Sequence, residues 1–427
     1  MEVRESTDAE RPRTGFREAL SLLRRNGDFR NLYLAQLISF GGDWFLLVAL
    51  YGVVYQLTHS ALMISLVLVS QLVPYFFFVP VAGVLADRMN RQALMVGADV
   101  VRAVLCLGFF LVGPGTVWLL FVLQAILSVF TAVFEPAASA AVPNLVDEED
   151  LSLANSLVGS AWGTMLAIGA ALGGLVAGAF GKDAAFVRDA VSFVLSAGLL
   201  IAIRRPFSEG RSEERIEVIR GTVETVRYAR EDRRVLALLL VKIGFGLSGG
   251  VLVLLPLFAR KVFHQGDVGT GILYGMRGVG ALVGPFIGRR IAGRSDGGLF
   301  GAIGIALFVF AIFYGVFPFL PFLVLAGVCA AGAHVGGGAQ WTLSTYGIQR
   351  FVPDRILGRV FSFDFALVTL MLAVSNLGAG WAAQHFGPKT TMFGLAALGF
   401  AYTAVWWVAT RRLRAGWPRD RMGMTRG

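Results

Sequence analysis

The sequence predicts an all-α membrane protein with twelve transmembrane helices in two pseudo-symmetric six-helix bundles. Three observations support this fold class: the apolar composition, the number of long apolar runs, and the sorting of basic residues between those runs. Hydrophobic residues make up 56% of the 427-residue chain and charged residues only 15%. So little charge does not cover the surface of a soluble domain of this size.

Twelve apolar runs approach or exceed the roughly 20 residues that a helix needs to cross a bilayer. The first six are expected at 31–57, 61–85, 92–112, 116–141, 153–180 and 184–203. The second six are expected at 235–263, 268–291, 299–317, 319–345, 358–384 and 390–410. Several joins are very short, such as Thr58-His59-Ser60, so we expect consecutive helices to be antiparallel neighbours.

Basic residues fall mainly in alternate gaps between the runs. Of 38 Lys and Arg residues, 30 lie on one predicted side, 5 lie on the other, and 3 lie inside apolar runs. Cytoplasmic flanks of membrane helices carry such an excess. We therefore expect a multi-pass protein of the bacterial inner membrane with both termini in the cytoplasm. The net charge of +10 then suits anionic lipid headgroups, and we expect no nucleic-acid partner.

The chain is expected to divide into five segments. These are an N-terminal cytoplasmic segment (1–30), a first bundle (31–203), a cytoplasmic linker (204–234), a second bundle (235–410) and a cytoplasmic tail (411–427). The linker is expected to contain an amphipathic helix, because apolar residues recur in it at helical spacing: Ile216, Ile219, Val223 and Val226. The motifs Val146-Asp147-Glu148 and Val352-Pro353-Asp354 each precede the fifth helix of a half. Two parallel halves of this kind place a binding site between them near the membrane midplane.

The loop between the second and third predicted helices contains Gly83, Asp87, Arg88, Asn90 and Arg91. It resembles the signature loop of the major facilitator superfamily, Gly-x-Leu-x-Asp-Arg-x-Gly-Arg. Asn90 replaces a Gly, and because Asn tolerates a left-handed backbone, we expect the turn to persist. The resemblance implies that the loop locks the two halves together and that Asp87 is the latch. The alternative is a basic loop that only sets orientation.

Further motifs resemble the macrolide-efflux and enterobactin-exporter branch of that superfamily. They are Gly41-Gly42-Asp43-Trp44, Phe134-Glu135-Pro136-Ala137, Val142-Pro143-Asn144-Leu145-Val146, Leu153-Ala154-Asn155-Ser156-Leu157 and Asp189-Ala190-Val191-Ser192-Phe193. The resemblance implies a proton-driven exporter of a drug, macrolide or siderophore. The run Gly169-Ala170-Ala171-Leu172-Gly173-Gly174 is similar to an antiporter motif in which Pro is usual where Ala170 stands. Close packing of small residues explains it equally well.

We assign seven ionisable residues to the predicted spans: Asp43, Asp99, Arg102, Glu135, Lys242, Arg277 and Asp364. Each costs about 2.5–3.5 kcal/mol at a helix centre, so these side chains should face a cavity or each other. Asp99 and Arg102 are three residues apart and can pair on one helix face. We expect a structural pair there, and gate or structural roles for Arg277 and Asp364.

Asp43 lies near the middle of the first span, with Gln36 and Tyr51 on nearly the same helix face. The family resemblance implies that spans one, four, seven and ten line a central cavity. The expected proton and substrate cavity is formed by Asp43, Gln36, Tyr51, Gln124, Glu135, Lys242, His334 and Gln340. Since a dry interior favours a neutral carboxyl, we expect Asp43 or Glu135 to carry a proton.

These patterns together predict a secondary active transporter that works as a monomer among membrane lipids and exchanges a small amphipathic molecule for protons. The alternatives are a downhill facilitator for a lipid or metabolite, and a sensor or scaffold with the same fold. The sequence contains no Walker loop, no His-Glu-x-x-His and no Gly-x-Ser-x-Gly, so we do not expect an enzyme. We expect neither a cofactor nor a metal, because Cys106 and Cys329 are typical of small core residues.

The predicted topology is testable by labelling single cysteines in intact cells. A membrane-impermeant maleimide should react with cysteines that replace His59 and Pro114, which lie in outer turns, and not with Arg215→Cys in the basic linker. External labelling of Arg215→Cys would show that the orientation is reversed.

Overall fold

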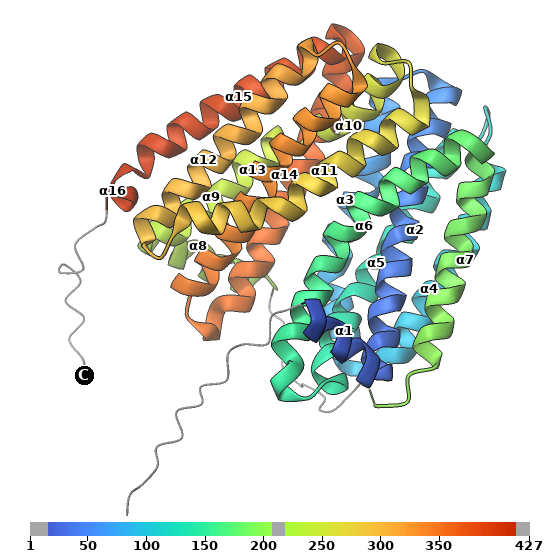
Figure 1. Ribbon diagram of the computed structural model, residues 1–427, viewed down its shortest axis with the longest axis horizontal. Helices are drawn as coiled ribbons and strands as arrows, with labels where there is room; N and C mark the ends of the chain where they lie inside the picture. The colour runs from blue at the N-terminus through green and yellow to red at the C-terminus, as the bar shows by residue number, and fades with distance from the viewer. Residues whose placement is uncertain (1–15, 207–217, 416–427) are drawn as a thin grey trace, which may run out of the picture.

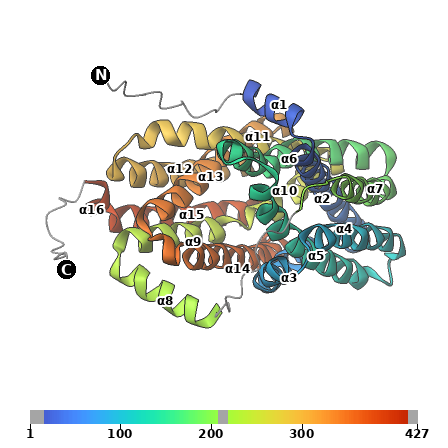
Figure 2. The ribbon, with the colours of Figure 1, turned by 90° about the horizontal axis from the view of Figure 1, so that it is seen from below.

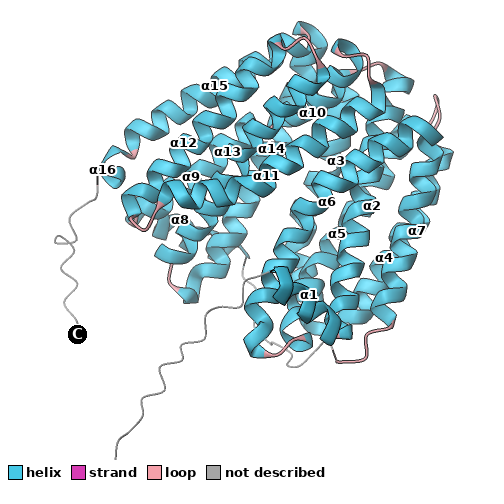
Figure 3. Ribbon diagram, in the orientation of Figure 1, coloured by secondary structure: helices cyan, strands magenta, loops and turns pink. Residues whose placement is uncertain are grey.

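The protein is described by a computed structural model that covers residues 16–206 and 218–415. Within these ranges the chain forms helices joined by short turns, and no strand is present (Figure 3). Twelve of the helical segments are long and apolar enough to cross a membrane. This confirms the predicted fold class.

The first bundle follows a short helix α1 (Phe16–Arg25) that lies inside the predicted N-terminal segment. Its six long helices are α2 (Gly27–Thr58), α3 (Ala61–Arg88), α4 (Arg91–Gly108), α5 (Val117–Leu145), α6 (Leu151–Phe180) and α7 (Lys182–Ile201). The Asn26 side chain accepts a hydrogen bond from Phe29 N at 2.9 Å and donates one to Leu145 O at 2.7 Å. Arg25 pairs with Asp150 at 2.5 Å, so α1 is attached to the end of the bundle.

The second bundle follows the linker helix α8 (Val218–Glu231). Its helices are α9 (Arg233–Ser248), α10 (Val251–Leu257), α11 (Gly266–Ala292), α12 (Asp296–Val316), α13 (Leu323–Phe351), α14 (Asp354–Phe386) and α15 (Pro388–Ala409), with a final turn α16 (Arg411–Arg414). Ile216 of the predicted amphipathic helix lies outside the described residues, as do the side chains of Ile219 and Val223. In the described part of α8, Ala229 is buried and Tyr228 Oη donates to Phe351 O at 3.2 Å.

The seventh span is not the continuous helix that the sequence predicts. It breaks at Gly249 and Gly250, where the backbone turns between α9 and α10. Gly250 N donates to Ser375 Oγ of α14 at 2.9 Å, which satisfies a backbone group that the break leaves free. The span then ends in a π-helical turn, Phe258–Val262. Glycine pairs and π-turns are common causes of helix irregularity, and π-turns are frequent at functional sites.

The turn between α3 and α4 corrects one expectation. Asn90 has an extended backbone, with φ −66° and ψ 114°, and not a left-handed one. Its side chain accepts a hydrogen bond from Ala93 N at 3.0 Å and caps α4. Asn is among the preferred residues at this position of a helix, so it replaces the usual Gly by capping. Arg91 supports the turn by donating to Ala86 O at 3.1 Å and to Ala140 O at 2.8 Å.

The two bundles lie side by side and touch along two helix pairs, α6 with α11 and α3 with α14 (Figures 1 and 2). We call the end that carries α1, the turn between α3 and α4, and α8 the basic face, and the other end the opposite face. Toward the basic face the ribbons of the two bundles diverge (Figure 1).

Contacts between the bundles concentrate in the half nearer the opposite face. A Cβ atom built on Gly174 of α6 would lie 2.6 Å from Gly271 Cα of α11, so only glycine permits this approach. On the second pair, Ala61 N donates to Gln384 Oε1 at 2.8 Å. Closer to the basic face, Gly159 has no neighbour within 4 Å of its Cβ position, and Phe286 is 74% exposed.

The packing at Gly174 can be tested with a matched glycine. Gly174→Ala should lower the thermal unfolding temperature in detergent, because the methyl group would push α6 away from α11. Gly159→Ala, with open space at its Cβ position, should be neutral or stabilising by about 0.5–1 kcal/mol, since Ala favours a helix more than Gly does. Equal effects of the two substitutions would contradict the described interface.

Candidate functional site

The centre of the first bundle contains a buried guanidinium, Arg102 of α4, which is 1% exposed. It forms an ion pair with Asp99 one turn earlier and lies 3.8 Å from Asp43 Oδ2 of α2. The rings of Phe134 and Phe193 lie 4.8 Å and 4.2 Å from its Cζ atom. Arg102 therefore connects the predicted structural pair to Asp43, where the sequence treats the two as separate features.

A further carboxyl, Asp189 of α7, is fully buried beside this group. Cys106 Sγ donates to Asp189 Oδ2 at 3.1 Å, and Ser192 Oγ lies 3.2 Å from its Oδ1 atom. A Cβ atom on Gly42 would collide with the Asp189 and Ser192 side chains. The motifs around Gly42 and Asp189, which are far apart in the sequence, are thus complementary parts of one helix contact.

Glu135 of α5 completes the group. It accepts a hydrogen bond from Tyr75 Oη of α3, and its charge acts on Asp43 and Arg102. Tyr75 in turn lies against Phe365 of the second bundle, with ring centroids 6.0 Å apart. The protonation state of Glu135 is therefore linked, through its hydrogen bond to Tyr75, to the contact that Tyr75 makes with the other bundle.

We call these five residues the acid cluster: Asp43, Asp99, Arg102, Glu135 and Asp189. Four carboxyls lie around one guanidinium, and Asp43 and Asp99 come within 4.0 Å of it. Full ionisation would leave three negative charges uncompensated. Burial of an unpaired charge is costly, and two carboxylates that share a site do not both ionise readily. Of the two acids that pair with Arg102, Asp43 has the more exposed side chain, 18% against 0% for Asp99. Its position suits exchange of a proton with water.

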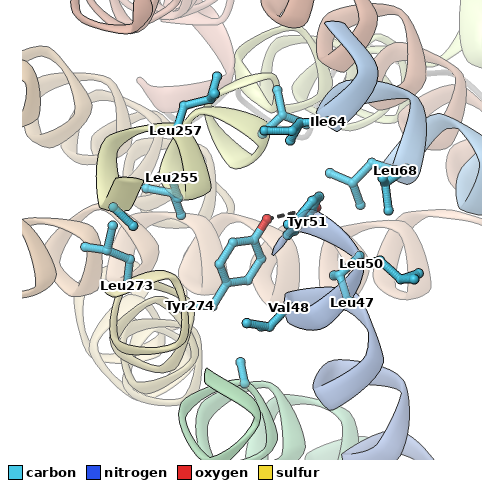
Figure 4. Packing of buried hydrophobic residues seen from close by; sticks show 14 of the residues in the cluster. Leu47, Val48, Leu50, Tyr51, Ile64, Leu68, Leu255, Leu257, Leu273 and Tyr274 are labelled. Carbon is cyan, nitrogen blue, oxygen red and sulfur yellow. Dashed lines mark hydrogen bonds between the residues drawn. The ribbon is translucent and has the colours of Figure 1, made fainter. Parts of the chain in front are cut away.

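The other predicted cavity residues of the first bundle lie in drier places. Gln36 and Gln124 are buried, and the Oε1 atom of each has no hydrogen-bond partner. Tyr51 does not share the surroundings of Asp43. It is fully buried in an apolar cluster at the bundle contact, where its hydroxyl lies 3.1 Å from that of Tyr274 on α11 (Figure 4).

The second bundle holds a separate buried ion pair. Lys242 Nζ of α9 lies 3.5 Å from Asp364 Oδ2 of α14 and 3.6 Å from the centre of the Trp341 ring. His334 is bonded to Tyr314 Oη at 3.0 Å and packs among aromatic rings. Gln340 is fully buried, and neither of its amide atoms has a hydrogen-bond partner.

Arg277 of α11 differs from the other buried basic residues. Within the described ranges no carboxylate lies within 4.0 Å of it, whereas Arg102, Lys242 and Arg260 each have at least one. Its Nε atom has no hydrogen-bond partner, and the residue is only 8% exposed. Among the described residues Arg277 therefore forms no ion pair, and its gate or structural role stays a prediction.

A polar contact closes the opposite face. Arg260, on the π-helical turn, forms an ion pair with Asp267 and donates to Thr270 Oγ1 at 3.0 Å. Its Cζ atom lies 5.7 Å from the ring centre of Tyr55 in the other bundle. A cavity of about 310 Å³ lies beside this contact and is lined by Asp267 together with residues of the first bundle that include Gly52.

The predicted latch is described only in part. The backbone places Gly83 and Asp87 in the last turns of α3, but their side chains lie outside the described residues. Arg88 is exposed beside them, and Arg91 supports the turn through carbonyl oxygens. The latch role of Asp87 stays a prediction.

The geometry is that of a membrane protein with two packed bundles and charged groups buried at mid-depth. The sequence matches the family model of the Major Facilitator Superfamily over residues 32–364. The chain therefore belongs to the major facilitator superfamily of membrane transporters and is not an enzyme.

Relatives with curated descriptions include efflux proteins. A Bacillus subtilis protein that carries the name of a bacilysin exporter, BacE, is 26% identical over 347 residues, which cover 81% of this chain and 86% of that protein. Macrolide efflux protein A of Streptococcus pyogenes is 25% identical over 380 residues, covering 84% and 90%.

Solved structures share the fold. A bacterial homologue of the human lysosomal transporter Spinster superposes with a TM-score of 0.75 at 14% identity, covering 95% of this chain and 100% of that one. The nucleoside transporter NupG gives a TM-score of 0.69 at 12% identity, covering 90% and 99%. At these identities the likeness concerns the fold alone.

Sequence reasoning missed Asp189, Arg260 and Asp267 as charged groups of interest. Asp189 lies inside a predicted span and was recognisable as a costly intramembrane acid, although only its motif drew notice. Arg260 and Asp267 flank a predicted outer turn, where charge is ordinary. Only the fold shows that they meet residues of the other bundle.

The acid cluster predicts a pH-dependent stability effect at Arg102. Arg102→Met should lower the thermal unfolding temperature in detergent, because breaking a buried ion pair by removing one partner costs about 3–5 kcal/mol. The loss should be smaller at mildly acidic pH, since protons neutralise the carboxylates that the guanidinium otherwise balances. Arg102→Lys keeps the charge and should lose less. An equal deficit at acidic and alkaline pH would contradict the proposed charge balance.

Proposed function

We propose that the protein is a proton-coupled exporter of a small amphipathic molecule, such as a macrolide, another drug or a siderophore. The observation that carries this proposal is the acid cluster at mid-depth in the first bundle, in which Asp43 and Asp99 pair with the buried guanidinium of Arg102 and two further carboxyls lie close by. A group of this kind stores protons and changes its net charge when it releases one. The efflux names of relatives in Bacillus and Streptococcus support the export direction.

The proposed orientation places the basic face in the cytoplasm, because the excess of Arg lies in its loops. The protein would then lie in the bacterial inner membrane as a monomer, with both termini cytoplasmic. In the described conformation the bundles touch near the opposite face and diverge toward the basic face (Figure 1). Substrate would enter from the cytoplasm and the membrane, and alternate closure of the two ends would release it outside.

Proton coupling would act through charge. Moving a bundle interface past a buried carboxylate is costly in a dry intermediate. Protonation of Asp43 removes that charge and lets the bundles rearrange. Because Asp43 and the other acids lie around the same guanidinium, a proton gained by Asp43 reduces the excess of negative charge around Arg102. Substrate and proton binding would then be linked reciprocally.

Opposite-face closure would depend on the contact among Arg260, Asp267 and Tyr55. Opening that face requires Tyr55 to leave Arg260, and it requires Gly52 to leave Asp267. On the basic face, Asp87 is the proposed latch of the alternate state, as the family signature implies. A bias of about 0.3–1 kcal/mol from one helix-end charge is enough to shift a two-state balance noticeably.

The proposal predicts that Asp43→Asn abolishes uphill export but leaves downhill exchange measurable. The amide mimics the protonated carboxyl, so the bundles can still move, but no proton is carried. The measurement is efflux from proteoliposomes, with and without an imposed pH gradient, of two labelled amphipathic probes, a macrolide and a molecule that carries a free carboxylate.

The control for this test is Asp147→Asn, which removes a carboxylate that is 78% exposed at the basic face. It should leave gradient-driven export unchanged. If Asp43→Asn still moves against its gradient a probe that the wild type exports, Asp43 is not the coupling residue, and Glu135 is the next candidate. If the wild type itself shows only downhill movement, the protein is a facilitator.

A further inference from the structure

Arg277 is the one described basic side chain buried at mid-depth without a carboxylate. Arg102 has Asp99 and Asp43, and Lys242 has Asp364. Arg277 is 92% buried by contrast, and its Nε atom has no hydrogen-bond partner. A guanidinium presents several N–H donors in a planar fork, and it stays charged under all ordinary conditions. Its charge is therefore available to a group that the protein itself does not supply.

The depth of Arg277 matches that of the acid cluster. Helix α6 lies between the two sites: its Gly169 touches the Gly41 backbone of α2, and its Ala167 touches Gly278 of α11. Two residues on a helix span a rise of about 3 Å. Asp43 is two residues from Gly41 and Arg277 is next to Gly278. The two residues consequently lie within about one helical turn of the same level, one in each bundle.

Aromatic side chains from both bundles surround the guanidinium. Its Cζ atom lies 5.8 Å from the ring centre of Trp44 on α2 and 5.4 Å from that of Tyr274 on α11. Such rings hold a guanidinium in place by cation–π attraction without neutralising it. Trp44 is only partly buried, so it also offers apolar surface for a ligand beside the charge.

We propose that Arg277 binds a carboxylate group of the transported molecule. The planar fork of arginine matches a carboxylate in a bidentate geometry, and Trp44 would pack on the apolar part next to that group. This inference rests on the proposed export function and narrows its substrate class to amphipathic molecules that carry a carboxylate. Since Trp44 follows Asp43 directly, ligand binding at Arg277 would be sensed at the acid cluster through the same turn of α2.

The test is equilibrium binding of two matched probes to the full-length protein in lipid nanodiscs. The probes are dansyl-phenylalanine, which carries a free carboxylate, and its methyl ester, which lacks that charge. Dansyl fluorescence gives both dissociation constants. The wild type should bind the acid about tenfold or more tightly than the ester, as a charge-assisted bidentate contact implies.

Arg277→Gln should bring the ratio of the two dissociation constants close to one while leaving ester binding nearly unchanged. Arg277→Lys keeps the charge but not the planar fork, so it should retain part of the preference for the acid over the ester. This variant is the one to measure if Arg277→Gln does not fold. The matched control is Arg411→Gln, which removes an exposed charge from α16 and should keep the wild-type ratio.

Three outcomes would overturn the proposal. The wild type could bind acid and ester equally, or bind neither. Arg277→Gln could keep the preference for the acid. Arg277→Gln could weaken both probes alike, which would make Arg277 a packing residue. Because this measurement uses no gradient, its failure leaves proton coupling at Asp43 untouched, and failure of uphill export leaves the carboxylate preference to be measured independently.

Discussion

The shared guanidinium of Arg102 is the interaction on which the centre of the first bundle depends. It contacts acids on α2 and α4, and phenylalanines on α5 and α7 pack against it. In a bilayer an unpaired buried charge is expensive, so these groups must stay together or exchange protons. The same arrangement that stabilises the bundle thereby supplies a group that can carry a proton.

The two bundles accommodate buried charge in different ways. The first concentrates acids around one cation. The second pairs Lys242 with Asp364, and it leaves Arg277 at the bundle contact with no carboxylate among the residues that the structure describes. The acid excess of one bundle thus lies at nearly the same depth as an unpaired cation of the other. Because of this asymmetry, a substrate with its own negative charge can pair with the cation at the interface.

Glycine determines where the bundles meet. Gly174 and Gly271 let α6 and α11 approach until their backbones touch, and no larger residue fits there. In the run that contains Gly174, close packing therefore explains why this position is a glycine, and the resemblance of the run to an antiporter motif stays a prediction. Small-residue contacts of this kind pack helices closely in membranes, where no hydrophobic effect drives helices together.

The sequence by itself determined the class of protein, the number of spans and the sorting of charge, because apolar length and Arg distribution act locally along the chain. It also pointed to Asp43, since an acid in an apolar run is conspicuous. Only the tertiary structure decided which charges meet. Asp43 lies near Arg102 and beside Asp189 because Gly42 admits α7, and Tyr51 turns into the apolar bundle contact. Arg277 lacks a carboxylate for the same reason: partners in a helix bundle come from distant segments, and their identity depends on packing that no local pattern records.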